Sequence, residues 1–179
     1  MKKNWFDSKV KDFSLIGGYQ KPQLNDNSLK LDSNENYVLS KQFQNDIVSG
    51  ARKNSDVREY PLGGVERLIQ MISKFVKIPT SMIGIGNGSD QILDLILSNF
   101  ASKETKVLTS NPTFGFFEER CKLYSIPLIA IPFSNNMKLD VEKFIKESKN
   151  ADILYLDSPN NPTGFQFSKT EIKKLIKSF

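Results

Sequence analysis

The residues most suited to chemistry begin at a glycine-rich junction, GNGSD, over residues 86–90. The junction lies between a short apolar run and a segment with helical spacing, which predicts a strand-to-helix turn. The first N–H groups of a helix lack intrahelical partners and the helix dipole is positive there, so such a turn favours a phosphate group. Gly86 and Gly88 would let the backbone approach that anion closely. An ordinary turn with Asp90 in the first helical turn is the alternative interpretation.

Two other kinds of phosphate-binding loop do not fit this junction. Gly84 and Gly86 begin the GxGxxG pattern of dinucleotide-binding folds, but Ser89 stands where the third glycine belongs. The next predicted strand ends in Ser110-Asn111 and offers no acidic residue to hold a ribose. No Gly-Lys-Ser/Thr follows the junction, as a P-loop requires.

Alternating strands and helices are expected to position this loop. Apolar spacing predicts helices over residues 66–76, 89–100, 114–124 and 141–148, the last with Asp140 as its N-cap. A final helix begins with a capping box formed by Ser168 and Glu171. Apolar runs predict strands at residues 82–85, 106–109, 128–131 and 151–156. This alternation predicts an α/β fold with a mainly parallel sheet and helices on both faces.

Composition limits the classes of function. The chain has 179 residues, 39% hydrophobic content and a net charge of +5 from scattered basic residues, which indicates a solvated surface and no nucleic-acid partner. It contains no histidine, which excludes Ser-His and Cys-His nucleophiles and a histidine-ligated metal. Its single cysteine fits a cytoplasmic location. No stretch approaches the ~18–20 continuous apolar residues of a membrane helix, so no membrane partner is expected.

Four more stretches occur with NGSD in a fixed order: LDSNEN at residues 31–36, EYPLGG at 59–64, NPTFG at 111–115 and LDSPNNPTG at 156–164. Together they resemble the pyridoxal-phosphate-dependent aminotransferases of fold type I, and in particular the histidinol-phosphate aminotransferase subfamily. The resemblance runs from about Tyr19 to the last residue, and SPNNPTG and NGSD are its most specific parts. It implies the fold-type I transferase fold. Residues 1–50 would be an N-terminal arm with a small-domain segment, and residues 51–179 an incomplete large cofactor-binding domain.

The resemblance implies a site for pyridoxal 5′-phosphate. Backbone N–H groups at Gly88, Ser89 and Asp90, with the Ser89 hydroxyl, would hold the phosphate. Phe114 would stack on the pyridine ring, where the family often has tyrosine. Asn161 would donate its amide N–H to the cofactor's phenolic oxygen, which favours the ionised phenolate.

Three further residues are implied to lie around that site. Tyr60 would reach across a homodimer interface to the cofactor phosphate of the neighbouring subunit. Tyr19 would line the substrate pocket from the N-terminal arm, and Asn36 would lie at its edge. For both tyrosines, a plain packing role is the alternative.

The groups that do the family's chemistry are not found in this chain. Such enzymes need a Schiff-base lysine, an aspartate against the pyridine nitrogen and substrate-binding arginines, all beyond SPNNPTG. The pairs Ser73-Lys74 and Ser168-Lys169 lack the Gly-x-Arg that follows the family's lysine. We therefore assign no catalytic residue here and expect a fragment that is inactive alone.

The implied reaction converts histidinol phosphate and 2-oxoglutarate to imidazole acetol phosphate and glutamate, in histidine biosynthesis. Threonine-phosphate decarboxylase and aromatic aminotransferases share much of the motif set and remain alternatives. An alternative of another class is a non-catalytic α/β module that binds a phosphorylated ligand.

Overall fold

The computed structural model describes residues 7–8, 10–11, 13–14, 29–31, 33–56, 58–60 and 64–179. The chain divides into two compact units. One is built on residues 86–179, and the other lies within residues 19–85.

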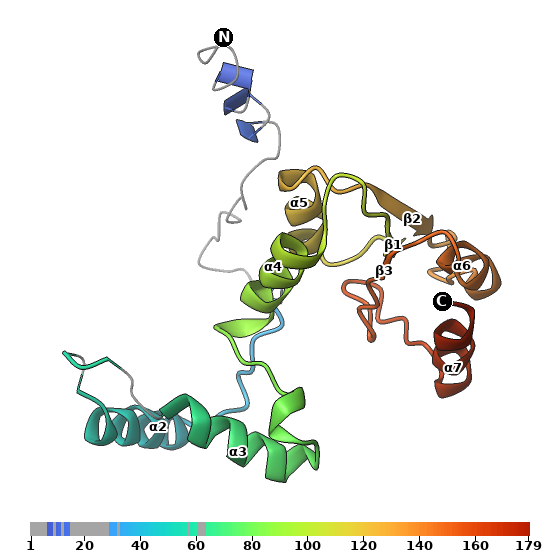
Figure 1. The fold of residues 1–179 in the computed structure, drawn as a ribbon. Coiled ribbons are helices and arrows are strands. Elements are labelled where there is room, and N and C mark those ends of the chain that lie inside the picture. The colour runs from blue at the N-terminus through green and yellow to red at the C-terminus, as the bar shows by residue number, and fades with distance from the viewer. Residues whose placement is uncertain are drawn as a thin grey trace. The chain divides into compact units, whose positions relative to one another are not determined.

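The unit of residues 86–179 contains a parallel sheet with the strand order β2-β1-β3 (Figure 1). The strands are β1 (Val107–Asn111), β2 (Leu128–Pro132) and β3 (Ile153–Leu154). In the central strand, residues 107–110 are all buried. That pattern is expected of a parallel strand covered on both faces. The predicted strands at 106–109 and 128–131 are confirmed, and the one at 151–156 is shorter than expected.

One face of this sheet is covered by α4 (Gly88–Phe100) and α5 (Gly115–Leu123). Val107 of β1 points to this face and packs with Leu97 of α4 and Phe117 of α5. These helices confirm those predicted over residues 89–100 and 114–124.

The opposite face is covered by α6 (Val141–Ser148) and α7 (Lys169–Ser178), which lie next to each other (Figure 1). Leu108, the neighbour of Val107, points to this face because successive side chains of a strand alternate. It packs with Phe144 of α6 and Leu175 of α7. The predicted N-cap of α6 is confirmed, since the Asp140 carboxylate accepts the Lys143 N–H at 2.9 Å.

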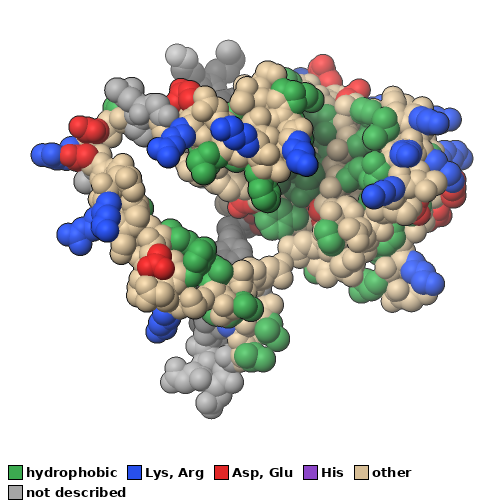
Figure 2. Space-filling model, turned by 90° about the horizontal axis from the view of Figure 1, so that it is seen from below, with side chains coloured by type: hydrophobic (Ala, Val, Ile, Leu, Met, Phe, Trp, Pro, Cys, Tyr) green, Lys and Arg blue, Asp and Glu red, His purple; other side chains and the backbone are tan. Residues whose placement is uncertain are grey.

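The unit within residues 19–85 is helical where it is described. It contains α2 (Lys41–Asn54), α3 (Gly64–Val76) and a 3-10 turn, η1 (Thr80–Met82). None of these three elements has a buried residue, and Phe75 of α3 is 88% exposed. Hydrophobic side chains are accordingly visible on the surface in Figure 2. The helix predicted over residues 66–76 is confirmed, whereas α2 was not anticipated.

The predicted strand at residues 82–85 is wrong. The 3-10 turn ends at Met82, and residues 83–86 have no regular structure. Gly84 and Gly86 offer no side chain to pack in a strand, and a strand needs a neighbour to satisfy its backbone. Met82 is exposed, and residues 83–86 join no strand of the described sheet.

The predicted capping box of α7 is confirmed. The Ser168 hydroxyl accepts the Glu171 N–H at 3.2 Å, and the Glu171 carboxylate accepts the Ser168 N–H at 2.7 Å. The hydrogen bonds from Ser168 lower the pKa of the Glu171 carboxyl. The ionised carboxylate therefore stabilises the fold fully above the ordinary carboxyl pKa, and this contribution is lost as pH falls through the lowered value.

Replacing Ser168 with alanine should lower the free energy of unfolding by about 1 kcal/mol at neutral pH, because an N-terminal N–H loses its acceptor. Urea unfolding measures the loss. Thr170→Ala is the matched control, since Thr170 is exposed within the first turn and is not the cap. Equal stabilities for the two variants would contradict the assigned role of Ser168.

Candidate active site at the carboxyl end of the sheet

The predicted phosphate loop lies at the N-terminus of α4. The side chain of the N-cap residue, Asn87, makes no capping hydrogen bond. Its backbone N–H instead donates to the side-chain oxygen of Gln91 at 2.6 Å. Ser89 and Asp90 are exposed in the first turn. The helix therefore begins without a side-chain cap from Asn87, at the end whose dipole attracts an anion.

The two glycines of the loop are needed for different reasons. A Cβ at Gly86 would lie 2.9 Å from both the Gln91 Oε1 and the Ile92 Cδ1 atoms, so the Gln91 and Ile92 side chains would have to shift to admit it. Gly88 has a φ of +79°, in the left-handed region, and no atom lies within 4 Å of where its Cβ would be. The backbone at Gly88 thus borders open space, which fits an anion held by the helix N-terminus.

The second predicted segment, residues 157–164, follows β3 and is organised by Asn160. This side chain is only 4% exposed. Its amide nitrogen lies 2.9 Å from the Asp157 carboxylate, 3.2 Å from the Pro112 carbonyl and 3.3 Å from the Ser110 hydroxyl. Its amide oxygen accepts the Thr163 N–H at 3.0 Å and the Thr163 hydroxyl at 2.5 Å. Asn160 therefore ties this loop to the end of β1.

Asn161, the residue predicted to contact the cofactor, is exposed on this loop. Its backbone N–H donates to the Asp157 carboxylate at 3.1 Å. Gly164 closes the turn with a φ of +72°, and its N–H donates to the Asn160 carbonyl at 2.8 Å. The loop is thus held from inside while the Asn161 side chain remains accessible. Sequence reasoning missed Asn160 and Asp157, although adjacent polar residues in a turn often bond the backbone.

Phe114 stands at the N-cap of α5, directly after the loop that follows β1. Its side chain is half-buried, and its ring centroid lies 6.0 Å from that of Phe116. The Asn160 amide donates to the carbonyl of Pro112, which lies two residues before Phe114. The segments of Phe114 and Asn161 therefore meet at the carboxyl end of β1.

Tyr155 directly follows β3 and packs against the helices on one face of the sheet. Its ring stacks on Phe117, with centroids 3.6 Å apart. Burial raises the pKa of Tyr155 to about 12, and the carboxylates of Asp157 and Asp90 add to the shift. Tyr155 also packs in the cluster that contains Leu93 and Leu97 of α4. The structure thus brings the segments of Phe114 and Asn161 together at the carboxyl end of β1, where open α/β folds bind ligands, and α4, whose first turn contains Ser89, packs on the same sheet.

The remaining predicted residues belong to the other unit. Tyr60 is 89% exposed. The side-chain oxygen of Asn36 accepts the Val38 N–H at 3.1 Å, and Tyr19 lies outside the described residues. Their assigned roles stay predictions.

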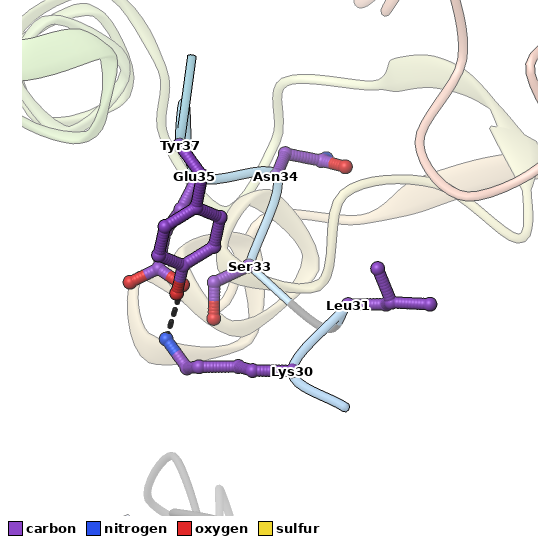
Figure 3. A pocket seen from close by; sticks show the side chains of 6 residues that line it. All are labelled: Lys30, Leu31, Ser33, Asn34, Glu35 and Tyr37. Carbon is purple, nitrogen blue, oxygen red and sulfur yellow. Dashed lines mark hydrogen bonds and ion pairs between the residues drawn. The ribbon is translucent and has the colours of Figure 1, made fainter. Parts of the chain in front are cut away.

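A surface pocket of about 240 Å³ is lined by residues that lie close to Asn36 in the sequence (Figure 3). Its lining residues are Lys30, Leu31, Ser33, Asn34, Glu35 and Tyr37. The Glu35 carboxylate pairs with the Lys30 ammonium and accepts the Tyr37 hydroxyl at 2.8 Å. The hydrogen bond from Lys30 has the largest effect on the pKa of Glu35, and this bond and the one from Tyr37 both lower it. The charged side chains that line the pocket thus pair with each other.

No helix in the described part of the chain has the length and apolar character needed to cross a membrane. No three or more carboxylate or cysteine side chains in it gather as a metal site would require.

Comparison with known proteins identifies relatives over most of the chain. The family model "Aminotransferase class I and II" matches residues 23–179. The chain is 31% identical over 149 residues to histidinol-phosphate aminotransferase of Pyrococcus furiosus, an alignment covering 83% of this chain and 43% of that protein. It is 32% identical over 164 residues to the Lactococcus lactis subsp. cremoris protein of the same name, covering 91% and 44%. The chain therefore spans less than half the length of these relatives.

Solved structures agree with the predicted fold. The histidinol-phosphate aminotransferase of Clostridium acetobutylicum superposes with a TM-score of 0.61 at 28% identity, covering 76% of this chain and 39% of that one. The Sinorhizobium meliloti enzyme, in complex with pyridoxal-5′-phosphate, gives a TM-score of 0.65 at 20% identity, covering 74% and 36%. These matches confirm the fold-type I α/β fold. With the family model matching residues 23–179, the chain belongs to the class I and II aminotransferase family.

Proposed function

We propose that the protein carrying this chain is a pyridoxal-phosphate-dependent aminotransferase that transfers the amino group of histidinol phosphate to 2-oxoglutarate. The observation that carries the proposal is the loop that holds Asn161 beside the end of β1, in the same unit as an α4 N-terminus that has no side-chain cap from Asn87. The names of relatives at 31% and 32% identity favour this substrate.

The residues present fit pyridoxal phosphate. The open space at Gly88 and the exposed first turn of α4 would receive the phosphate. The half-buried ring of Phe114 would stack on the pyridine, and the exposed amide of Asn161 would reach the phenolic oxygen. When bound, the cofactor supplies a ring that withdraws electrons from the substrate's α-carbon.

In this proposal, the chain's own residues bind and orient the cofactor. The dipole and N–H groups of α4, with the Ser89 hydroxyl, offset the charge of the phosphate. The side-chain amide N–H of Asn161 would favour the ionised phenolic oxygen, because a donor favours the charged form. Phe114 would stack on the ring and shield one face from water.

Other parts of the proposed site come from outside this unit. We propose a homodimer in which Tyr60 reaches the partner's cofactor phosphate, and the 89% exposure of Tyr60 leaves its hydroxyl accessible. Tyr19 and Asn36 would border the substrate. The lysine and aspartate of the chemistry are assigned to no residue of this chain, so residues 1–179 alone should transfer no amino group.

The test is to incubate the purified chain with pyridoxal phosphate, reduce with borohydride and map any labelled lysine. We expect the chain to bind pyridoxal phosphate more tightly than inorganic phosphate or pyridoxal. We expect no single lysine to be labelled stoichiometrically, and no transfer of the amino group from histidinol phosphate. A stoichiometric lysine together with transfer would contradict the absence of a catalytic residue. Equal affinity for inorganic phosphate would instead favour a general phosphate-binding module.

Sedimentation of the whole protein tests the proposed dimer. The proposed substrate is tested by comparing the rates at which the whole protein acts on histidinol phosphate, threonine phosphate and tyrosine.

A further inference from the structure

Asn161 is exposed, and its side chain acts as proposed only if the loop holds it in one place. Two hydrogen bonds within the loop share a single carboxylate oxygen as their acceptor. The Asp157 Oδ2 atom accepts the Asn160 amide at 2.9 Å and the Asn161 N–H at 3.1 Å. The backbone of Asn161 is therefore fixed directly by Asp157 and, through that shared oxygen, by Asn160.

The anchor of this arrangement is β1, not β3. β3 has two residues, whereas residues 107–110 of β1 are buried between two helical layers. Asn160 reaches this strand through the Ser110 hydroxyl and the segment just after it through the Pro112 carbonyl. Ser110 is itself 4% exposed, so the contact is shielded from water. A buried amide with this many partners leaves several polar groups unpaired when it is removed, and the loop must then move to satisfy them.

We infer that Asn160 and Asp157 are positioning residues that hold the Asn161 amide against the cofactor's phenolic oxygen. The inference rests on the proposed function. Neither residue needs to touch the cofactor. Their role is to fix the loop relative to β1, because a displacement of about 1 Å in a group near the reacting centre has large effects.

The experiment titrates the visible absorbance of pyridoxal phosphate bound to the purified protein, which reports ionisation of the phenolic oxygen. Asn161→Ala should raise the pH midpoint by about one unit, the effect of one hydrogen bond to a charged group. Asn160→Ala should raise it by a similar amount, and the double variant should add nothing further. Asn150→Ala is the matched control, since Asn150 is exposed beyond α6, and its midpoint should equal that of the unaltered protein.

A second pair of variants tests the same inference if Asn160→Ala does not fold. Asp157→Asn and Asp157→Ala both remove the negative charge, but only asparagine keeps an oxygen that can accept the Asn161 N–H. The midpoint should be higher in Asp157→Ala than in Asp157→Asn. Equal midpoints in this pair, or an unshifted Asn160→Ala beside a shifted Asn161→Ala, would overturn the positioning role and leave the proposed function standing. An unshifted Asn161→Ala would overturn the role of Asn161 in the proposed function itself.

Discussion

Replacement of Gly88 with valine should reduce retention of pyridoxal phosphate by about 100-fold or more, the equivalent of one or two hydrogen bonds to a charged group. No protein atom lies within 4 Å of the position of the new Cβ, so the side chain would enter the space assigned to the phosphate. The φ of +79° adds backbone strain of about 1–2 kcal/mol for a non-glycine residue. Absorbance after dialysis measures the cofactor that remains.

Two further variants separate loss of the ligand from loss of stability. Gly88→Asn tolerates a positive φ better than valine but still fills the same space, so it should lose the cofactor with a smaller drop in the unfolding temperature. Gly84→Val adds the same bulk at a glycine without a positive φ and outside α4, and it should retain the cofactor. Full cofactor occupancy in Gly88→Val would exclude a phosphate at this helix N-terminus.

The second large effect is expected in the hydrophobic core. Phe144 of α6 is fully buried, and its ring meets that of Phe167 edge-on, with centroids 5.5 Å apart. Phe144→Ala should lower the free energy of unfolding by about 3–5 kcal/mol, because it removes buried contacts and leaves a cavity. Domains are stable by only ~5–15 kcal/mol, so this change should bring the unit close to unfolding.

Phe100→Ala is the matched control for this substitution. Phe100 belongs to the same unit, at the end of α4, and is 78% exposed. Its replacement should cost less than about 0.5 kcal/mol. Urea unfolding of both variants gives the comparison, and similar losses would show that Phe144 is not a core residue.

The sequence by itself determined the elements whose signals are local. Apolar spacing and the N-caps at Asp140 and Ser168 predicted α6 and α7, because a cap bonds the backbone within three residues. Of the two confirmed strands, β1 begins with the buried pair Val107 and Leu108, and β2 is an apolar run in which Ile131 is buried. The order and spacing of five motifs, of which NGSD and SPNNPTG are the most specific, indicated the aminotransferase family, which the family model confirms.

Other features depended on tertiary structure. An apolar run at residues 82–85 reads as a strand, but no strand of the described sheet pairs with it. α2 begins at a Ser40 cap and carries Phe43, Ile47 and Val48 at helical spacing, but all three are exposed and the helix has no buried residue. In both segments, the local sequence pattern alone did not predict the secondary structure, because the structure also depended on whether neighbouring elements were present.

The candidate site divides in the same way. The sequence singled out Asn161, but the structure shows that its neighbour Asn160 is the buried residue that bonds Ser110, 50 positions earlier, and Pro112, 48 positions earlier. Tyr155 likewise gains its surroundings from Phe117 of α5, on which its ring stacks. Burial and long-range hydrogen bonding exist only once separate segments meet. The sequence therefore identified which residues could bind a phosphorylated cofactor, and the fold decided which residues hold them in place.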